Sequence, residues 1–271
     1  MKKQETVRVG VIGTGNMGGA LVRGLTANFP PDTISIYDID AEKARILAKD
    51  LSTSPADDIK NLVDNSHIIV LAVKPDKIVS VLEEIKSHIK PECVIVSIAA
   101  GITIAAMQKS AGPGAKIVRT MPNTPAMVGQ GMTTICASEA VTADDMAAVQ
   151  GIFQCVGRVL ELPEKLMDAV TAVSGSGPAY AYTFIQAMVD GGVKMGIPRD
   201  KALIMAAQTV LGAATMVLES GDDPVTLRGR VTSPGGTTIE GIHVLERAGF
   251  SGIVMDAVEK AAMKSKKLGE G

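Results

Sequence analysis

Up to about residue 165, short apolar runs alternate with stretches in which apolar residues recur at helical spacing. The runs that we predict as strands are Val7–Ile12, Thr33–Tyr37, His67–Val73, Val94–Ile98, Lys116–Arg119 and Met132–Cys136. Strands that alternate with helices are typical of a mostly parallel sheet with helices on both faces. We therefore predict an α/β domain of the Rossmann type over residues 1–164.

The pattern changes after Pro163, where the charged pair Glu164 and Lys165 makes a junction. Beyond it strand patterns disappear, and long helical segments rich in Ala, Met and Gly follow. A chain of 271 residues suits two ordinary domains. We predict that residues 165–271 form an all-α domain.

The segment Ala202–Leu218 is apolar except for one Gln and two Thr residues, and it approaches the ~20 residues that cross a bilayer. Because the run is short and contains Gly212, a helix buried on all faces of a protein core is favoured over a membrane span. Phe184–Val189 is almost as apolar. A helical domain of this size cannot bury two such surfaces alone, which predicts an obligate homodimer with interleaved helices.

Charge and composition exclude several partners. Lys and Arg number 27 against 29 Asp and Glu, so no broad basic surface is available for a nucleic acid. The first six residues are polar and lack the apolar core of a signal peptide, which favours a cytoplasmic protein. Cys93, Cys136 and Cys155 form no CxxC pair and are expected to be small core residues, and three scattered histidines predict no metal site.

A glycine-rich turn follows the first predicted strand. Its sequence is Gly13-Thr14-Gly15-Asn16-Met17-Gly18, and a helical run comes next. Gly13 suits the tight turn, Gly15 lets a pyrophosphate approach the backbone, and Gly18 allows close packing of helix on strand. The helix start offers unpaired N–H groups to the phosphates. The strand before and the helix after favour a dinucleotide site over an ordinary turn.

The second predicted strand ends at Tyr37-Asp38. A carboxylate here accepts hydrogen bonds from a ribose 2′-OH and repels a 2′-phosphate, which favours NADH. Lys43 and Arg45 follow closely and could reach a phosphate, or they could be solvated charges on a helix face. The cofactor therefore stays NADPH or NADH.

Further loops at strand ends fit the same crevice, since ligands of open α/β sheets lie beyond the carboxyl ends of the strands. Each loop alone could be an ordinary connection, and Lys74 could be a solvated lysine. The residues expected to bind the cofactor are Gly13, Gly15, Asn16, Met17, Gly18, Asp38, Ala72, Val73, Lys74, Pro75, Ala99, Ala100, Pro122 and Asn123.

Two small-residue runs stand out in the helical region. Val173–Tyr180 reads as a helix start that another group can approach closely. Val231–Thr238 opens a predicted helix from Ile239 to Arg247. Here the N–H groups of Gly236, Thr237 and Thr238, with the Ser233 hydroxyl, would make a carboxylate-sized anion site. The alternative is a turn followed by an N-cap Thr.

These motifs, in this order, resemble those of the pyrroline-5-carboxylate reductases over almost the whole chain. The motifs are GxGxMG, AVKP, SxAAG, RxMPNTP, SGSGPAY, DGGVKMGIPR and VTSPGGTT. The resemblance implies reduction of 1-pyrroline-5-carboxylate to L-proline by NAD(P)H, and an interlocked homodimer that can assemble into a decamer. It also implies that Ser233, Gly236, Thr237 and Thr238 bind the substrate, with Thr238 as the catalytic residue near the ring nitrogen. Glu219 is a candidate for an acid that contacts this nitrogen, but the alignment there is ambiguous.

This chemistry requires no obligatory His or Lys. A cyclic imine can enter protonated at nitrogen and accept hydride directly, whereas a ketone needs a proton donor. Two alternatives are weaker. β-Hydroxyacid dehydrogenases share the GxGxMG start but place a catalytic lysine soon after the second glycine-rich turn, and here no lysine follows Gly177 until Lys194. A non-catalytic NAD(P)H sensor would not need a second, carboxylate-sized site.

Overall fold

The computed structural model describes residues 7–269. The first six residues, whose polar character supports the cytoplasmic expectation, lie outside the described residues. The chain forms two compact units: residues 1–176 together with 261–271, and residues 177–260. We call them the sheet unit and the helical unit.

The predicted boundary after residue 164 differs from this division. Met167 and Val170 belong to the same buried core as Ile104, which lies in the sheet unit. Ser265, near the end of the chain, donates a hydrogen bond of 2.7 Å to Asp168. Residues on both sides of the helical unit therefore pack on the sheet unit.

The sheet unit is built on eight strands. They are β1 (Val9–Ile12), β2 (Ile34–Tyr37), β3 (Ser54–Pro55), β4 (Ile68–Leu71), β5 (Val94–Ser97), β6 (Lys116–Met121), β7 (Gly131–Ala137) and β8 (Gly157–Glu161). Their order is β3-β2-β1-β4-β5-β6-β7-β8. Every neighbouring pair is parallel except β6 and β7. All six predicted strands are present, while β3 and β8 were missed because β3 is very short and β8 is half polar.

The strands are apolar on both faces because both faces are covered. In β4, Ile68 and Val70 join one buried core, and Ile69 and Leu71 join the other. Alternate side chains of a strand point to opposite faces, so a continuous apolar run is what a sheet between two helical layers requires.

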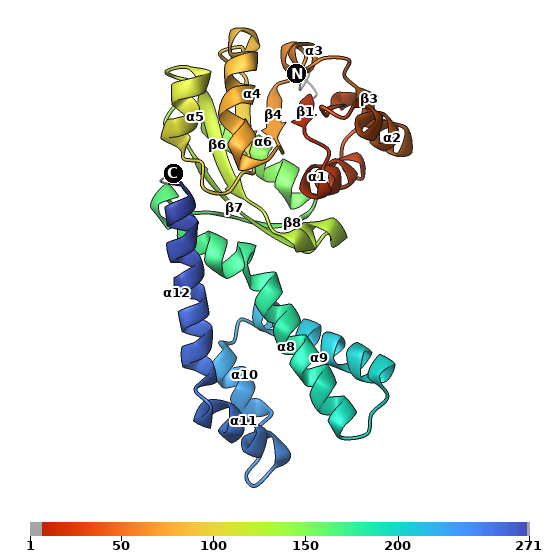
Figure 1. Ribbon diagram of the computed structural model, residues 1–271, viewed down its shortest axis with the longest axis vertical. Coiled ribbons are helices and arrows are strands. Elements are labelled where there is room, and N and C mark those ends of the chain that lie inside the picture. Colours follow the sequence, from red (N-terminus) through yellow and green to blue (C-terminus); the bar gives the residue numbers. More distant parts are fainter. Residues whose placement is uncertain (1–6, 270–271) are drawn as a thin grey trace. The chain divides into compact units, whose positions relative to one another are not determined.

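The helices of the sheet unit lie on both faces of the sheet (Figure 1). They are α1 (Asn16–Thr26), α2 (Ala41–Leu51), α3 (Ile59–Asp64), α4 (Ile78–Ile85), α5 (Ile104–Ala111), α6 (Ala143–Gln154) and α7 (Met167–Val170). The core that contains Leu21 and Phe153 covers one face with α1 and α6. The core that contains Leu82 and Met107 covers the other with α4 and α5. The predicted Rossmann-type α/β fold is confirmed.

The helical unit contains no strand among its described residues, as the pattern predicted. Its helices are α8 (Gly177–Lys194), α9 (Arg199–Ser220), α10 (Pro224–Arg230), α11 (Thr237–Arg247) and the first half of α12 (Phe250–Gly269). Helices α8 and α9 pack through a small core of Val189, Ala202 and Ala206.

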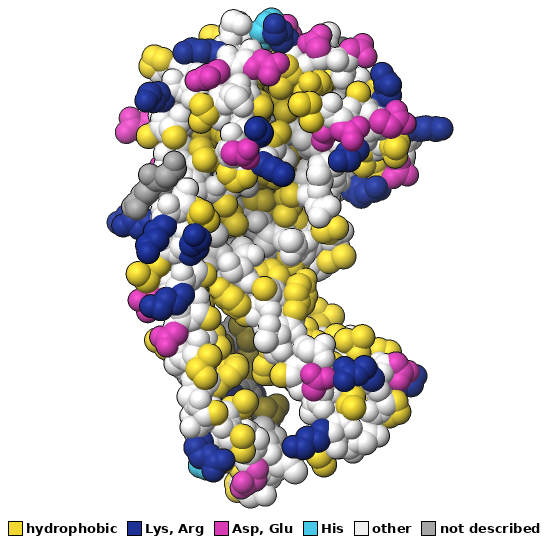
Figure 2. Space-filling view, in the orientation of Figure 1, with side chains coloured by type: hydrophobic (Ala, Val, Ile, Leu, Met, Phe, Trp, Pro, Cys, Tyr) yellow, Lys and Arg dark blue, Asp and Glu magenta, His cyan; other side chains and the backbone are white. Residues whose placement is uncertain are grey.

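Helix α9 is long and apolar enough to cross a membrane, with a mean hydropathy of 1.6 over its most apolar window. Only 11% of that window is buried within one chain. Ile204 and Leu218 are 65% and 58% exposed. The prediction of a helix buried on all faces is therefore wrong for the single chain, and Figure 2 shows apolar side chains exposed over the helical unit.

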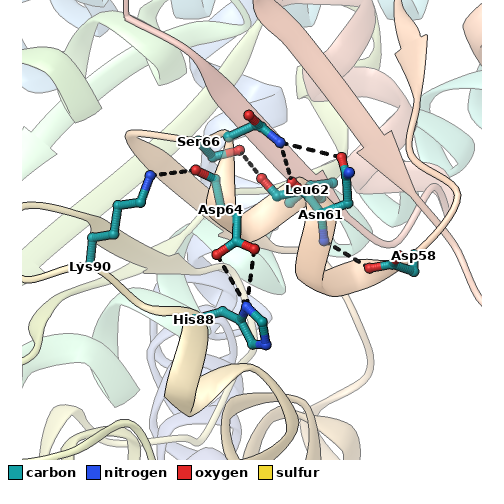
Figure 3. Close-up of polar contacts among 8 residues, drawn as sticks. Asp58, Asn61, Leu62, Asp64, Ser66, His88 and Lys90 are labelled. Atoms are coloured by element: carbon teal, nitrogen blue, oxygen red, sulfur yellow. Dashed lines mark hydrogen bonds and ion pairs between the residues drawn. The ribbon is translucent and has the colours of Figure 1, made fainter.

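A cluster of polar residues lies at the amino ends of β4 and β5, whereas the glycine turn follows the carboxyl end of β1. His88 Nδ1 lies 3.1 Å from both carboxylate oxygens of Asp64, and Lys90 donates to the Asp64 carbonyl oxygen (Figure 3). Asp58 caps α3 by accepting from the N–H of Asn61 at 2.8 Å. These contacts hold α3 against the segment after α4, so His88 has a structural role.

Candidate active site

The glycine turn after β1 has the conformation that the sequence predicted. Gly13 has a φ of +100°, and its N–H donates to the Tyr37 carbonyl oxygen at 2.7 Å. A Cβ at Gly13 would lie 2.6 Å from the Ala72 carbonyl oxygen, and one at Gly18 would collide with the Gly13 carbonyl oxygen. Both positions therefore require glycine: L residues rarely adopt the φ of Gly13, and neither position has room for a side chain.

Gly15 contributes open space in front of the helix. A Cβ there would meet nothing within 4 Å, and no side chain caps the start of α1 at this residue. The first N–H groups of α1 are thus left for a ligand, as is typical of a phosphate site. This turn fits the pyrophosphate of a dinucleotide. Met17 is half-buried against the core, where it supports the helix start rather than the open side of the turn.

A cavity of about 400 Å³ adjoins the turn, lined by Gly15 and Asn16 together with the cations Arg23 and Lys43. Arg23 pairs with Asp50 at 2.7 Å, and Lys43 Nζ lies 3.7 Å from Asp40. Lys43, one of the two cations that the sequence singled out, therefore reaches the phosphate side of the site. Arg45 lines a separate, smaller hollow with Asp38, and Arg23 was missed because it lies inside the helix pattern.

Asp38 lies at the end of β2 with its carboxylate tied to the glycine turn. One oxygen accepts from the Thr14 N–H at 2.6 Å and from the Thr14 hydroxyl at 2.8 Å. The other accepts from the Asp40 N–H at 3.0 Å. Burial alone would raise the pKa of Asp38, but these hydrogen bonds outweigh it and hold the pKa below its usual value. Asp38 therefore stays ionised beside the cofactor site.

The loops after β4 and β5 frame a second cavity, which belongs wholly to the sheet unit. It has a volume of about 670 Å³. Pro75 and Ala100, both predicted cofactor residues, line it. Lys74 is exposed just before it, and Ala99 is buried at 4% exposure. Ala72 and Val73 are half-buried, and the N–H of Ala72 donates to the Ile12 carbonyl oxygen, so this stretch ties β4 to the glycine turn.

The other side of this cavity was not predicted. Thr171 and Ser176 line it from the segment before α8, and Lys264 and Ser265 line it from the end of α12. The SGSGPAY motif pointed to Ser176 as part of an approachable helix start. No local pattern could have identified Lys264 and Ser265, because they reach the cavity through tertiary packing.

The cofactor contact of Asn123 stays a prediction, and its side chain is held inside the protein. Its side chain is only 9% exposed, and Pro122 before it is also buried. The Asn123 amide nitrogen donates to the Ser174 carbonyl oxygen at 3.0 Å, and its amide oxygen accepts from the Met132 N–H at 2.8 Å. The amide thus connects the loop after β6 with two other segments.

In the helical unit, the loop before α11 has the geometry of an anion site. Gly236 is the N-cap of α11 and no side chain caps it, so the alternative of an N-cap Thr is wrong. A Cβ at Gly236 would collide with the Ser233 hydroxyl oxygen. Within residues 7–269, the hydroxyls of Ser233, Thr237 and Thr238 make no hydrogen bond to the protein. The Gly236 N–H donates to the Ser233 carbonyl oxygen at 3.0 Å, so the donors left for a carboxylate are the N–H groups of Thr237 and Thr238 and the three hydroxyls. Glu219, at the end of α9, is exposed.

The cysteines offer no nucleophile. Cys93 and Cys136 are buried as predicted, and Cys155 is half-buried. Burial raises the pKa of the Cys93 thiol to about 12 and that of Cys136 to about 11. The thiols therefore stay protonated at neutral pH, whereas a cysteine nucleophile must be in its thiolate form.

A parallel sheet with a dinucleotide turn at β1, together with an uncapped anion cradle elsewhere in the chain, defines a dinucleotide-dependent oxidoreductase. Sequence comparison gives the family. Residues 164–268 match the profile of the pyrroline-5-carboxylate reductase dimerisation family, and residues 8–101 match that of the NADP oxidoreductase coenzyme F420-dependent family.

Relatives match along the full length. The pyrroline-5-carboxylate reductase of Escherichia coli K12 is 42% identical over 263 residues, covering 96% of this chain and 98% of its own. That of Arabidopsis thaliana is 40% identical, covering 98% and 97%. The solved structure from Coxiella burnetii has a TM-score of 0.94 at 34% identity, covering 97% and 99%. The Plasmodium falciparum enzyme, solved with NADP bound, has a TM-score of 0.86 at 36% identity, covering 98% and 99%. The chain belongs to the pyrroline-5-carboxylate reductase family, which confirms the resemblance.

Proposed function

We propose that the chain reduces 1-pyrroline-5-carboxylate to L-proline with NADPH or NADH, the last step of proline biosynthesis. Relatives that share about 40% identity over nearly the full chain carry this name in bacteria, archaea and plants. The observation that supports it most strongly is the uncapped loop at Ser233–Thr238, because a dinucleotide turn alone would suit many reductases.

The chain's residues divide the work of binding. The glycine turn holds the pyrophosphate, and the loops after β4 and β5 hold the nicotinamide half. The N–H groups of Thr237 and Thr238 and the Ser233 hydroxyl bind the substrate carboxylate, and Gly236, where a Cβ would collide with the Ser233 hydroxyl, keeps the loop open to it. The Thr238 hydroxyl, which can donate or accept, orients the ring nitrogen. Bound cofactor supplies the hydride. With the imine already protonated, the protein needs only to orient and to exclude water.

The two matched families support a division of labour along the chain. Residues 1–164 bind the dinucleotide, and residues 165–271 dimerise and bind the substrate, since the matched ranges are 8–101 and 164–268. The compact units differ slightly from these ranges, because residues 165–176 and 261–269 pack on the sheet unit while belonging to the second family range.

We propose that the chain forms a homodimer with interleaved C-terminal helices. Five such homodimers can assemble into a decamer. The exposed apolar surface of α9 supports a protein partner, and a second copy of the same helices offers a surface of matching character. We place the enzyme in the cytoplasm, where its dinucleotide is found, with neither nucleic acid nor membrane as a partner.

The activity is tested by following NADPH and NADH oxidation with racemic 1-pyrroline-5-carboxylate. Turnover with at least one cofactor is expected, and proline should appear in equal amount. Absence of turnover with both cofactors, in a protein that binds them, would point to the non-catalytic sensor instead.

Thr238→Ala tests the residue proposed at the ring nitrogen. Loss of the hydroxyl should lower kcat/KM for the imine by about tenfold or more, because one orienting hydrogen bond is lost. Cofactor affinity, measured by calorimetry, should stay within about threefold. Thr26→Ala, at the far end of α1, is the matched control. Equal losses of turnover and cofactor binding would contradict the assignment of Thr238.

A further inference from the structure

The segment between α7 and α8 has an unusual backbone. Thr171–Gly175 forms a single π-helical turn, which we call the π-turn. Such turns widen the helix and often occur at functional sites. The Ser174 carbonyl in this turn lacks the regular helical donor, because the residue four positions on is Pro178, which has no N–H, so donors from elsewhere in the chain are needed.

Asn123 supplies one of these donors. Its amide nitrogen bonds the Ser174 carbonyl oxygen inside the π-turn at 3.0 Å, across 51 residues of chain. Its amide oxygen is fixed by the Met132 N–H at the start of β7. The adjoining Met121 packs so closely on the π-turn that a Cβ at Gly175 would touch its terminal methyl group. The π-turn is therefore clamped to the sheet by the loop after β6.

The clamped π-turn contributes to the lining of the cavity beyond β4 and β5. Ser176 ends the π-turn and lines this cavity together with Pro75 and Ala100. The glycine turn follows β1, and β4 and β5 lie on the side of β1 away from β2 and Asp38. In such sheets a dinucleotide bound at the turn extends its nicotinamide half over these strands. The cavity is thus at the end of the site where hydride transfer takes place.

Among the hydroxyls near the π-turn, that of Ser176 is available to a ligand. The Thr171 hydroxyl donates to the Met167 carbonyl oxygen, and the Ser174 hydroxyl donates to that of Val170. The Ser176 hydroxyl makes no hydrogen bond to the described part of the chain. It can therefore donate to an oxygen of the reacting pair, which is either the carboxamide oxygen of the cofactor or a carboxylate oxygen of the substrate.

We propose that Asn123 is a positioning residue that clamps the π-turn and thereby sets the Ser176 hydroxyl in the reaction cavity. This inference rests on the proposed function and assigns Ser176 to the same site. It gives Asn123 a role inside the protein beside the expected contact with the cofactor, because the amide nitrogen and the amide oxygen each bond another segment of the chain.

The test is a double-mutant cycle with Asn123→Asp and Ser176→Ala. An ionised aspartate at 123 keeps an acceptor for the Met132 N–H but cannot donate to the Ser174 carbonyl, so the assays are run above neutral pH. Each single variant should lower kcat/KM by about tenfold. The kcat/KM of the double variant should be no more than about threefold below that of the less active single variant. The reason is that the effects of two residues that act through one another do not add. Asn61→Asp and Ser80→Ala, both exposed, are the matched controls.

Two further measurements separate the effect of Asn123 on the π-turn from the direct contact of Ser176 with a ligand. Amide hydrogen exchange at residues 172–177 should quicken in Asn123→Asp and stay unchanged in Ser176→Ala. Calorimetry should show that Asn123→Asp raises the cofactor Kd no more than Ser176→Ala does, because Asn123 acts through Ser176. In Ser176→Ala, a rise in cofactor Kd identifies the carboxamide as the acceptor, whereas a rise in imine KM alone identifies the substrate. Gly175→Ala, which pushes on Met121, perturbs the same turn if Asn123→Asp folds poorly.

Losses that multiply in the double variant would overturn the proposal, as would a large rise in cofactor Kd in Asn123→Asp alone. Failure of the proposed function is distinct, because then the unaltered protein would itself reduce no imine with either cofactor.

Discussion

At the residue scale, two polar side chains of the sheet unit are fixed by hydrogen bonds at positions where a cofactor residue is expected. The Asp38 carboxylate accepts from Thr14, and the Asn123 amide donates to the Ser174 carbonyl oxygen. Gly13 and Gly18 behave as predicted, because their roles follow from backbone geometry. Side-chain roles are harder to predict, since a polar group can serve the ligand or the fold.

Asp38 gives a prediction about the cofactor. Its carboxylate is ionised, so it should repel a 2′-phosphate and favour NADH. Asp38→Asn should raise the ratio of kcat/KM with NADPH to that with NADH by about tenfold, which corresponds to about 1.4 kcal/mol. Steady-state assays with both cofactors measure this ratio. Asp40→Asn removes a charge from the same segment and should change the ratio less. If the two variants behave alike, Asp38 does not discriminate the cofactors.

At the element scale, a partly buried ion pair joins a strand of the sheet unit to a helix that covers the sheet. Lys116 in β6 donates to Asp145 in α6 at 2.7 Å, and the two side chains are only 19% and 17% exposed. Asp145 also completes a capping box with Thr142 at the start of α6. The sequence predicted the strand but not the pair, because the partners are separated by 29 residues of chain.

Lys116→Met should destabilise the fold by about 2–3 kcal/mol, because it leaves a mostly buried carboxylate without its charged donor. Denaturant unfolding measures the change. Lys109→Met, on the exposed face of α5, should be close to neutral. A loss no larger than that of the control would show that the pair contributes nothing to stability.

The same pair predicts that the stability of the fold depends on pH. Burial alone would raise the pKa of Asp145, but the hydrogen bonds from Lys116 and Thr142 outweigh it, so the folded-state pKa is lowered. A group with a lowered pKa contributes stability that is present above its unfolded value, near 3.8, and is lost as the pH falls through the folded value. The difference in stability between the normal protein and Asp145→Asn should therefore shrink below about pH 4. A difference that persists unchanged down to pH 2 would argue against this.

At the scale of the whole molecule, the exposed apolar surface of the helical unit is the main unsatisfied feature. Large apolar side chains are exposed along α9 and α12, including Leu211, Met205 and Met255 at 56%, 57% and 71%. A surface of this kind usually marks an interface. The dimerisation family that spans residues 164–268 gives the same conclusion.

Light scattering should therefore find at least twice the chain mass of 28.1 kDa at micromolar concentration. Ile204→Glu, on α9, should dissociate or aggregate the protein, because it buries a charge in the proposed interface. Ile39→Glu, at a residue 95% exposed in the sheet unit, should leave the mass unchanged. A mass of ten chains would support the decamer, and a stable monomer would contradict the homodimer.

Local sequence patterns were enough to predict the mostly parallel sheet, the glycine turn and the helical region, because each depends on short-range periodicity or on backbone conformations that glycine favours. The sequence also identified the loop at Ser233–Thr238, though not that Gly236 is its cap. The tertiary structure alone decided that Asn123 clamps a π-turn, that Ser176 and Lys264 share a cavity, and that α9 is exposed in one chain. These features depend on contacts between residues far apart in the chain, and no local pattern records which distant groups meet.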